Sequence, residues 1–97
     1  MPILERVVEE HLRKEVKRIG GRAIKFTSSH LRALPDRLCI FPNGFCAFVE
    51  CKRPGRKPTP KQALMLKWLN RLGHIAVWLD SRPRVDAFIE WVQKNKL

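Results

Sequence analysis

Acidic residues are scarce in this chain. Only 9 Asp and Glu stand against 20 Lys and Arg in 97 residues, so the formal net charge is +11 at pH 7. This surplus disfavours strongly cationic partners and favours a polyanion, so we expect the partner to be a polyphosphate. The chain is too short for two filled cores, and we expect a single domain that spans residues 1–97.

Long apolar runs and cysteine motifs are also missing. No stretch approaches the roughly 20 apolar residues that span a bilayer, and MPILERVVEEHLRK carries acids where a signal peptide needs an unbroken apolar run. Cys39, Cys46 and Cys51 form no CxxC pair and no zinc-spaced cluster, which indicates neither a zinc finger nor a complete disulfide framework. We therefore expect a soluble, intracellular, cytoplasmic protein with reduced thiols, no membrane partner and no small-molecule cofactor.

Boundary residues divide the chain into helices and strands. Gly20-Gly21 ends a run of apolar residues at helical spacing. Pro42-Asn43-Gly44 is typical of a hairpin turn, since Asn and Gly tolerate a positive φ. Thr59-Pro60 is an N-cap followed by Pro at the first helical position, and Gly73 ends that helix. The expected elements are a helix over 3–19, a strand over 22–28, an irregular connection over 28–34, hairpin strands over 37–41 and 45–52, a helix over 60–72, a strand over 74–79 and a helix over 83–95.

The order α-β-β-β-α-β-α predicts an α/β fold. A hairpin-built sheet to which a later strand returns through a crossover helix combines antiparallel and parallel pairing. We therefore expect a mixed sheet flanked by helices.

Two carboxylates and an ammonium group are expected to meet at the ends of the hairpin strands. Side chains alternate along a strand, so Glu50 and Lys52 share one face while Cys51 points to the other. A hairpin that turns near residues 43 and 44 places position 36 opposite positions 51 to 52, which brings Asp36 close to Glu50.

Carboxylates this close repel one another unless a cation lies between them. The oxygens of Asp36 and Glu50, with the main-chain carbonyl of Cys51 and waters, form a shell that suits Mg²⁺, or Mn²⁺ as its substitute. Lys52 could then activate water for in-line attack on a phosphodiester. The simpler alternatives are a solvated cross-strand pair for Glu50 and Lys52 and an ordinary Pro-Asp turn for Asp36.

These residues resemble the PD-(D/E)xK nuclease signature and, over nearly the full chain, the VRR-NUC family of virus-type replication-repair nucleases. The matching motifs are Glu5 with Val8, Gly20-Gly21, Pro35-Asp36-Arg37-Leu38, Gly44, Phe48-Val49-Glu50-Cys51-Lys52 and, with a shifted spacing, Thr59-Pro60-Lys61-Gln62. Family members usually place a Gly two residues before the PD, where this chain has Ala33, so we expect the approach to the site to differ locally.

The resemblance implies a restriction-endonuclease-like core and two further site residues. Glu5 would be a metal ligand from the first helix, with Glu9 one turn later as the competing ligand, and Gln62 would orient water or phosphate. The alternatives are a helix N-terminal acid for Glu5 and a plain first-turn residue for Gln62. The resemblance also implies a homodimer that cuts branched DNA, such as four-way Holliday junctions, in a bacterial or phage-infected cell.

Basic and hydroxyl side chains flank the expected site. Such groups contact phosphates without regard to base sequence, although plain solvation is the alternative for each. The expected DNA contacts are Lys25, Ser28, His30, Arg32, Arg53, Arg56, Lys57 and Lys61.

We therefore predict a metal-dependent DNA endonuclease. The helices over 60–72 and 83–95 carry more apolar residues than one core-facing side needs, which favours a two-fold dimer. The main alternative is a non-catalytic basic DNA-binding module. A restriction-type enzyme acting on linear duplex is a second, but 97 residues leave little room for separate base-reading elements.

Overall fold

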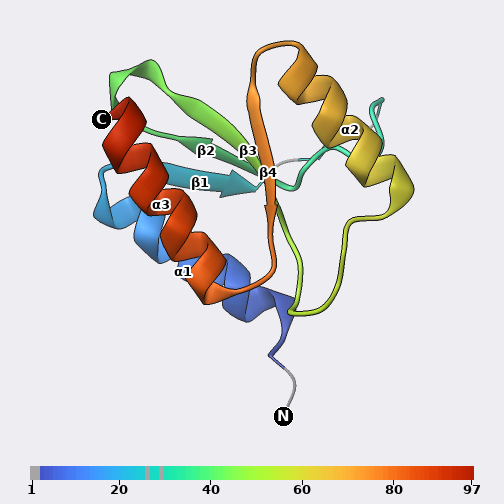
Figure 1. The fold of residues 1–97 in the computed structure, drawn as a ribbon, viewed down its shortest axis with the longest axis horizontal. Helices are drawn as coiled ribbons and strands as arrows, with labels where there is room; N and C mark the ends of the chain where they lie inside the picture. Colours follow the sequence, from blue (N-terminus) through green and yellow to red (C-terminus); the bar gives the residue numbers. More distant parts are fainter. Residues whose placement is uncertain (1–2, 26, 29) are drawn as a thin grey trace.

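The helices and strands follow the predicted order α-β-β-β-α-β-α in a computed structural model, which describes residues 3–25, 27–28 and 30–97 (Figure 1). They are α1 (Glu5–Arg18), β1 (Arg22–Lys25), β2 (Arg37–Ile40), the short 3₁₀ turn η1 (Pro42–Gly44), β3 (Cys46–Cys51), α2 (Pro60–Arg71), β4 (Ile75–Leu79) and α3 (Arg82–Lys96). The strand expected over 22–28 ends at Lys25; position 26 of that strand and position 29 of the following connection lie outside the described residues.

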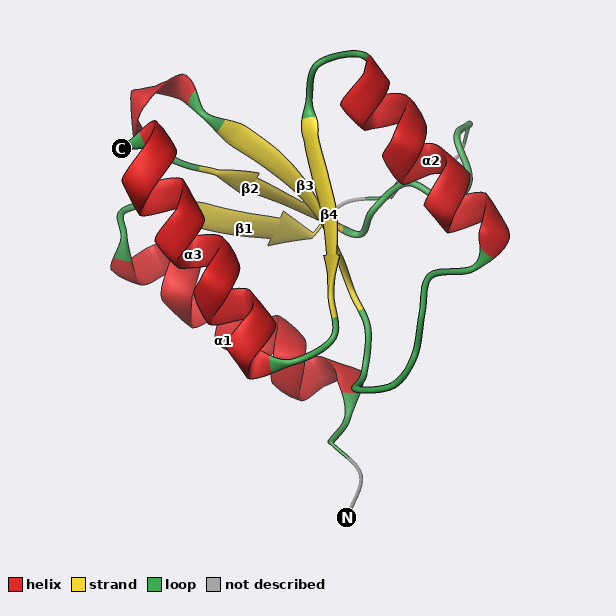
Figure 2. Ribbon diagram, in the orientation of Figure 1, coloured by secondary structure: helices red, strands yellow, loops and turns green. Residues whose placement is uncertain are grey.

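The sheet is mixed, as predicted. Its strand order is β1-β2-β3-β4, with antiparallel pairing of β1 to β2 and β2 to β3 and parallel pairing of β3 to β4. The helices α1 and α3 pack together over one face, and α2 packs against the other (Figure 2). Within the described chain, no helix combines the length and the apolar character that crossing a membrane requires.

The main core lies between the sheet and the pair formed by α1 and α3. Its buried members are Val8, Leu12, Val16, Cys39, Phe41, Ala47, Val49, Cys51, Leu79, Val85, Phe88, Ile89 and Val92. A smaller cluster joins Leu66 and Leu69 of α2 to Ala76, with Phe48 packed against it. Phe48 and Val49 thus lie on opposite faces, which confirms the predicted alternation along β3 and places Glu50 on the face that α2 covers.

The register of the hairpin differs by one to two residues from the prediction. The strands pair Arg37 with Val49 and Ile40 with Cys46, because the turn is a three-residue loop centred on Asn43, whose φ is 64°. The main-chain N–H of Phe41 donates to the carbonyl of Phe45 at 2.8 Å and closes this loop. Continued by one step, the register places Asp36 opposite position 50 rather than positions 51 to 52.

Candidate active site

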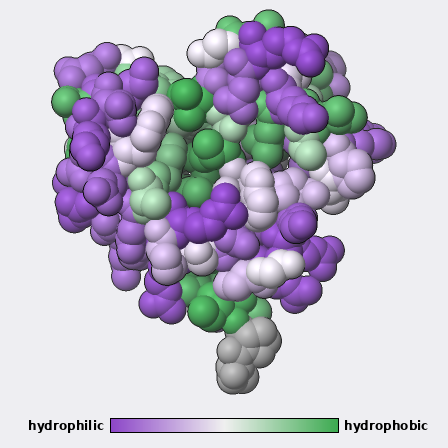
Figure 3. All heavy atoms as spheres, viewed as in Figure 1, coloured by the Kyte–Doolittle hydropathy of each residue, from purple (hydrophilic) through white to green (hydrophobic). Residues whose placement is uncertain are grey.

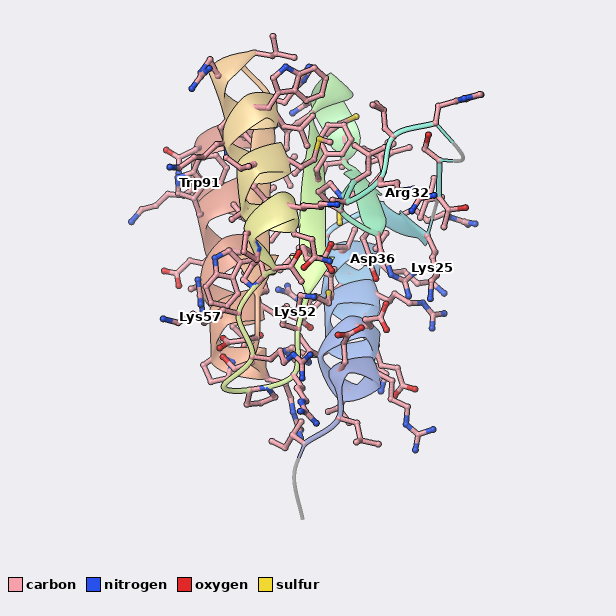
Figure 4. All side chains as sticks on the ribbon, turned by 90° about the vertical axis from the view of Figure 1, so that its right-hand side faces the viewer. Lys25, Arg32, Asp36, Lys52, Lys57 and Trp91 are labelled. Carbon is pink, nitrogen blue, oxygen red and sulfur yellow. The ribbon has the colours of Figure 1, made fainter. Side chains whose placement is uncertain are left out.

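Four carboxylates gather where α1 meets the ends of β2 and β3. One carboxylate oxygen from each of Glu5, Glu9 and Asp36 lies within 4.8 Å of the other two. Glu50, on the strand position facing Asp36, carries an ion pair between its Oε2 and the Nζ of Lys52 at 3.6 Å. Asp36 and Lys52 lie in the region between α1 and α2 (Figure 4). The two strands and the first helix thus bring together the acidic residues that the sequence pointed to.

Burial and mutual repulsion perturb the acids. Glu50 is only 6% exposed; burial, followed by the charge of Asp36, raises its pKa to about 7, against a smaller lowering effect of Lys52. Burial, followed by the charge of Glu9, raises the pKa of Asp36 to about 6, although the main-chain N–H of Cys51 acts in the opposite direction. Four acids thus lie beside only two paired cations, Lys52 and Arg37, and negative charge is concentrated at this point of a strongly basic chain.

The donor set fits a divalent cation. The Oδ1 atom of Asp36 is buried and has no hydrogen-bond partner among the described residues, and buried polar atoms without a partner are uncommon. Oxygen atoms of Glu5 and Glu9 converge on the same point. A hard divalent ion with oxygen ligands would satisfy the orphaned atom and neutralise the repulsion. The cluster therefore has the ligand chemistry of a divalent metal site.

The carboxylates that converge are not the same set as the expected metal ligands. Glu5 and Glu9 were competing candidates, and both lie beside Asp36; their i, i+4 spacing, which puts both on one helix face, is the signal that could have indicated this. Glu50 is not within the same 4.8 Å group, although its pKa is sensitive to the charges of both Asp36 and Glu5. The Cys51 thiol is buried in the main core, so only its main chain can face the acids.

Arg37 connects the acidic cluster to the sheet. Its Nη2 donates to Glu9 Oε1 at 3.2 Å and its Nη1 donates to the carbonyl of Ala23 at 3.4 Å. Both charged side chains of the Arg37–Glu9 pair are largely buried, at 11% and 13% exposure. The sequence contains this residue in the PDRL motif, but a contact with a helix 28 residues earlier in the chain could not be anticipated from it.

Gln62 has a structural role in α2. Its Oε1 accepts from the main-chain N–H of Thr59 at 2.9 Å, while Thr59 Oγ1 accepts from the N–H of Gln62 at 3.2 Å. This capping box confirms the predicted start of the helix. It uses the Gln62 oxygen and leaves the amide nitrogen as the atom that could reach a substrate.

The expected DNA contacts lie on both sides of the acidic cluster. Figure 4 shows Lys25 and Arg32 on one side of Asp36 and Lys57 on the other. Ser28 is instead occupied within its own turn, because its Oγ accepts from the main-chain N–H groups of His30 and Leu31. The exposed members of the set are Lys25, His30, Arg32, Arg53, Arg56, Lys57 and Lys61.

The approach to Asp36 contains a strained residue. Ala33 adopts a φ of 67°, a left-handed conformation that a side chain disfavours and that Gly adopts freely. This is the position where members of the family that the chain resembles usually carry Gly. The main chain therefore follows a path that Gly would adopt without strain. The chain differs from the family pattern in the residue type at this position.

Known proteins share this fold and much of this sequence. No family model matches the chain. The chain is 51% identical over 80 residues to "Putative nuclease p44" of Acyrthosiphon pisum secondary endosymbiont phage 1, a match that covers 82% of this chain and 86% of that protein. A solved structure of a "VRR_NUC domain" superposes with a TM-score of 0.84 at 29% identity, covering 89% of this chain and 94% of that one.

Proposed function

We propose that this chain, which belongs to the VRR-NUC family of nucleases, is a Mg²⁺-dependent endonuclease that hydrolyses phosphodiester bonds in branched DNA. One observation carries the proposal: carboxylate oxygens of Glu5, Glu9 and Asp36 lie within 4.8 Å of one another beside the Glu50–Lys52 ion pair. Three convergent acids next to an ammonium group are suited to metal-assisted hydrolysis.

The acids would hold the ion. Glu5, Glu9 and Asp36 would supply its protein ligands, with Glu50 and the Cys51 carbonyl adjoining. When bound, Mg²⁺ supplies Lewis-acid stabilisation of the charge that develops on the phosphate. Mn²⁺, which also accepts oxygen ligands, is the expected substitute.

Lys52 would orient the attacking water. Glu50 Oε2 holds its ammonium at 3.6 Å, and both side chains are largely buried, so the ammonium is held in a restricted position. An ammonium at this place can orient water and stabilise negative charge on the phosphate. The amide nitrogen of Gln62 would contact the same water or a neighbouring phosphate.

The exposed cations around the site would hold the DNA backbone. Phosphate contacts position a substrate without reading its sequence, and a chain of 97 residues leaves little room for separate base-reading elements. Selectivity for branched DNA, with four-way junctions as the leading candidate, would then come from shape. The phage origin of the relative fits a role inside an infected cell.

Two apolar surfaces support a homodimer. Leu64, Trp68 and Leu72 form a strip along α2 at i, i+4 spacing, and they are 65%, 44% and 56% exposed. Beside the edge strand β4, a hollow is lined largely by apolar side chains, which Figure 3 shows gathered between α2 and α3. A second copy would cover such surfaces, and a dimer would present two sites to two strands of a junction.

Cleavage assays test the proposal. Asp36→Asn, Glu50→Gln and Lys52→Met should each lower the cleavage rate by about 10²–10⁴-fold, while DNA binding in EDTA persists. Glu90→Gln, an exposed acid on α3, is the matched control and should cut normally. A linear duplex, a flap and a four-way junction of the same sequence should be compared, each with Mg²⁺, Mn²⁺ or EDTA.

The outcomes separate the candidate functions. Equal cutting of all three substrates would contradict selectivity for branches and favour the restriction-type alternative. Binding to DNA without cleavage under any divalent ion would leave a non-catalytic DNA-binding module.

A further inference from the structure

A basic groove lies between α1 and the edge strand β1. This α1–β1 groove has a volume of about 570 Å³ and is lined by Glu10, Arg13, Lys14, Lys17, Arg22, Ala23 and Ile24. It contains four cations and one acid, and none of these cations belongs to the expected set of DNA contacts. The groove is therefore a second positively charged surface.

The four cations share the groove with a single acid, Glu10. Among the described residues none of them forms an ion pair, whereas the neighbouring Arg18 pairs with Glu15 at 3.1 Å. Arg13 and Lys17 stand one helical turn apart on α1, an arrangement of like charges that destabilises a helix. These like charges repel one another in the free chain, and they line a concave surface. Both features indicate an anionic ligand.

The groove adjoins the acidic cluster through Arg37. The carbonyl of Ala23, a lining residue, accepts from Arg37 Nη1, while Arg37 Nη2 donates to Glu9. Arg13 and Lys17 follow Glu9 by one and two turns, so at 1.5 Å rise per residue they lie about 6 and 12 Å farther along the helix. One DNA strand advances about 3.4 Å per nucleotide, so along a strand that runs parallel to α1 these cations lie about two to four nucleotides from the acids.

We propose that the α1–β1 groove binds the phosphodiester backbone of the substrate DNA, about two to four nucleotides from the bond that is cut. The proposal rests on the proposed nuclease function, since it places the cleaved bond at the acidic cluster. Four side chains that offer only donors, together with the open edge of β1, suit phosphate oxygens and do not read bases.

The test measures DNA binding in EDTA, so that it does not depend on cleavage. The groove variant combines Arg13→Gln, Lys17→Gln and Arg22→Gln. The control variant combines Lys67→Gln, Arg71→Gln and Lys94→Gln, which are exposed positions on α2 and α3 and remove the same charge. The groove variant should bind a four-way junction at least about tenfold more weakly, and its slope of log K against log salt should be smaller by about 2–3. The control should stay within about twofold of the wild type.

A truncation series adds a positional readout. On DNA shortened to fewer than about two nucleotides on one side of the cut, wild type and groove variant should bind alike. Equal loss of binding in the groove and control variants would overturn the proposal, as would a groove variant that loses affinity for polyglutamate but not for DNA. If the groove variant binds DNA more weakly but the wild type cuts none of the substrates, the α1–β1 groove is a DNA-binding site and the proposed nuclease function is wrong.

Discussion

The carboxylates at the site make the stability of the metal-free chain depend on pH. The pKa values of Asp36 and Glu50, about 6 and about 7, lie above their ordinary values of 3.8 and 4.5. At a pH between the ordinary and the raised values, the folded chain therefore binds more protons than the unfolded chain. The protonated carboxyl groups therefore contribute fully to the free energy of unfolding below about pH 4, and this contribution is lost as the pH rises through about 7. We expect the free energy of unfolding in EDTA to fall by up to about 6 kcal/mol across this window, as measured by urea denaturation.

The matched control is the double variant Asp36→Asn with Glu50→Gln. It removes both titrating groups, so its stability should change less with pH, and at pH 8 without metal it should exceed that of the wild type. Mg²⁺ or Mn²⁺ should stabilise the wild type more at pH 8 than at pH 5, because protons compete with the ion. A wild type and a variant with the same pH dependence would contradict this account.

Arg37 is a second residue whose contribution can be measured. Arg37→Gln leaves the largely buried Glu9 without its partner, and we expect a loss of about 2–4 kcal/mol in unfolding free energy. Adding Glu9→Gln should recover part of this loss, because no buried charge then remains unpaired. Additive effects of the two substitutions in chemical denaturation would show that the ion pair has no coupling energy.

At the scale of elements, the connection between α1 and β1 depends on Gly21. A Cβ at this position would overlap the carbonyl oxygen of Ile40 and crowd Val16 and Phe41, so the main chain needs Gly in order to pass this close. We expect Gly21→Ala to destabilise the fold by about 1–3 kcal/mol. Gly55→Ala is a useful comparison, since its Cβ would meet nothing within 4 Å and only its positive φ disfavours a side chain; an equal effect at both positions would contradict the role of close approach.

The segment before β2 offers a stabilising change. Ala33 keeps a φ of 67°, which costs an L-residue about 1–2 kcal/mol, whereas Gly adds about 0.5–1 kcal/mol of unfolded-state entropy. We therefore expect Ala33→Gly to raise the unfolding free energy by about 0.5–1 kcal/mol with little change in cleavage. A destabilised Ala33→Gly protein in thermal or urea denaturation would contradict this expectation.

For the whole molecule, assembly is the property to measure. Light scattering after size exclusion should give twice the chain mass at micromolar concentration if the strip Leu64, Trp68 and Leu72 is covered by a second copy. Trp68→Ser with Leu72→Ser should then give the chain mass, while Leu97→Ser, a change at a comparably exposed terminal residue, should not. A monomeric wild type would reject the dimer without affecting the site.

Much of the fold could be predicted because its determinants are local. The turn Pro42-Asn43-Gly44, the cap at Thr59 and the glycines after each of the first two helices depend on φ preferences and side-chain caps that short segments already contain. The sequence also identified Asp36, Glu50 and Lys52 as site candidates, because the alternation of side chains along paired strands limits where they point. Their roles in metal binding and catalysis stay predictions.

The sequence alone thus determined the order of the elements, the mixed sheet and the acidic signature, because these follow from period, turns and spacing. Tertiary structure decided that Glu5 and Glu9 both lie beside Asp36 and that Arg37 contacts Glu9. It also gathered Arg13, Lys17 and Arg22 into one groove. These features depend on how α1 lies across the sheet, and contacts between segments far apart in the chain are set by the packing of the whole core rather than by any local preference.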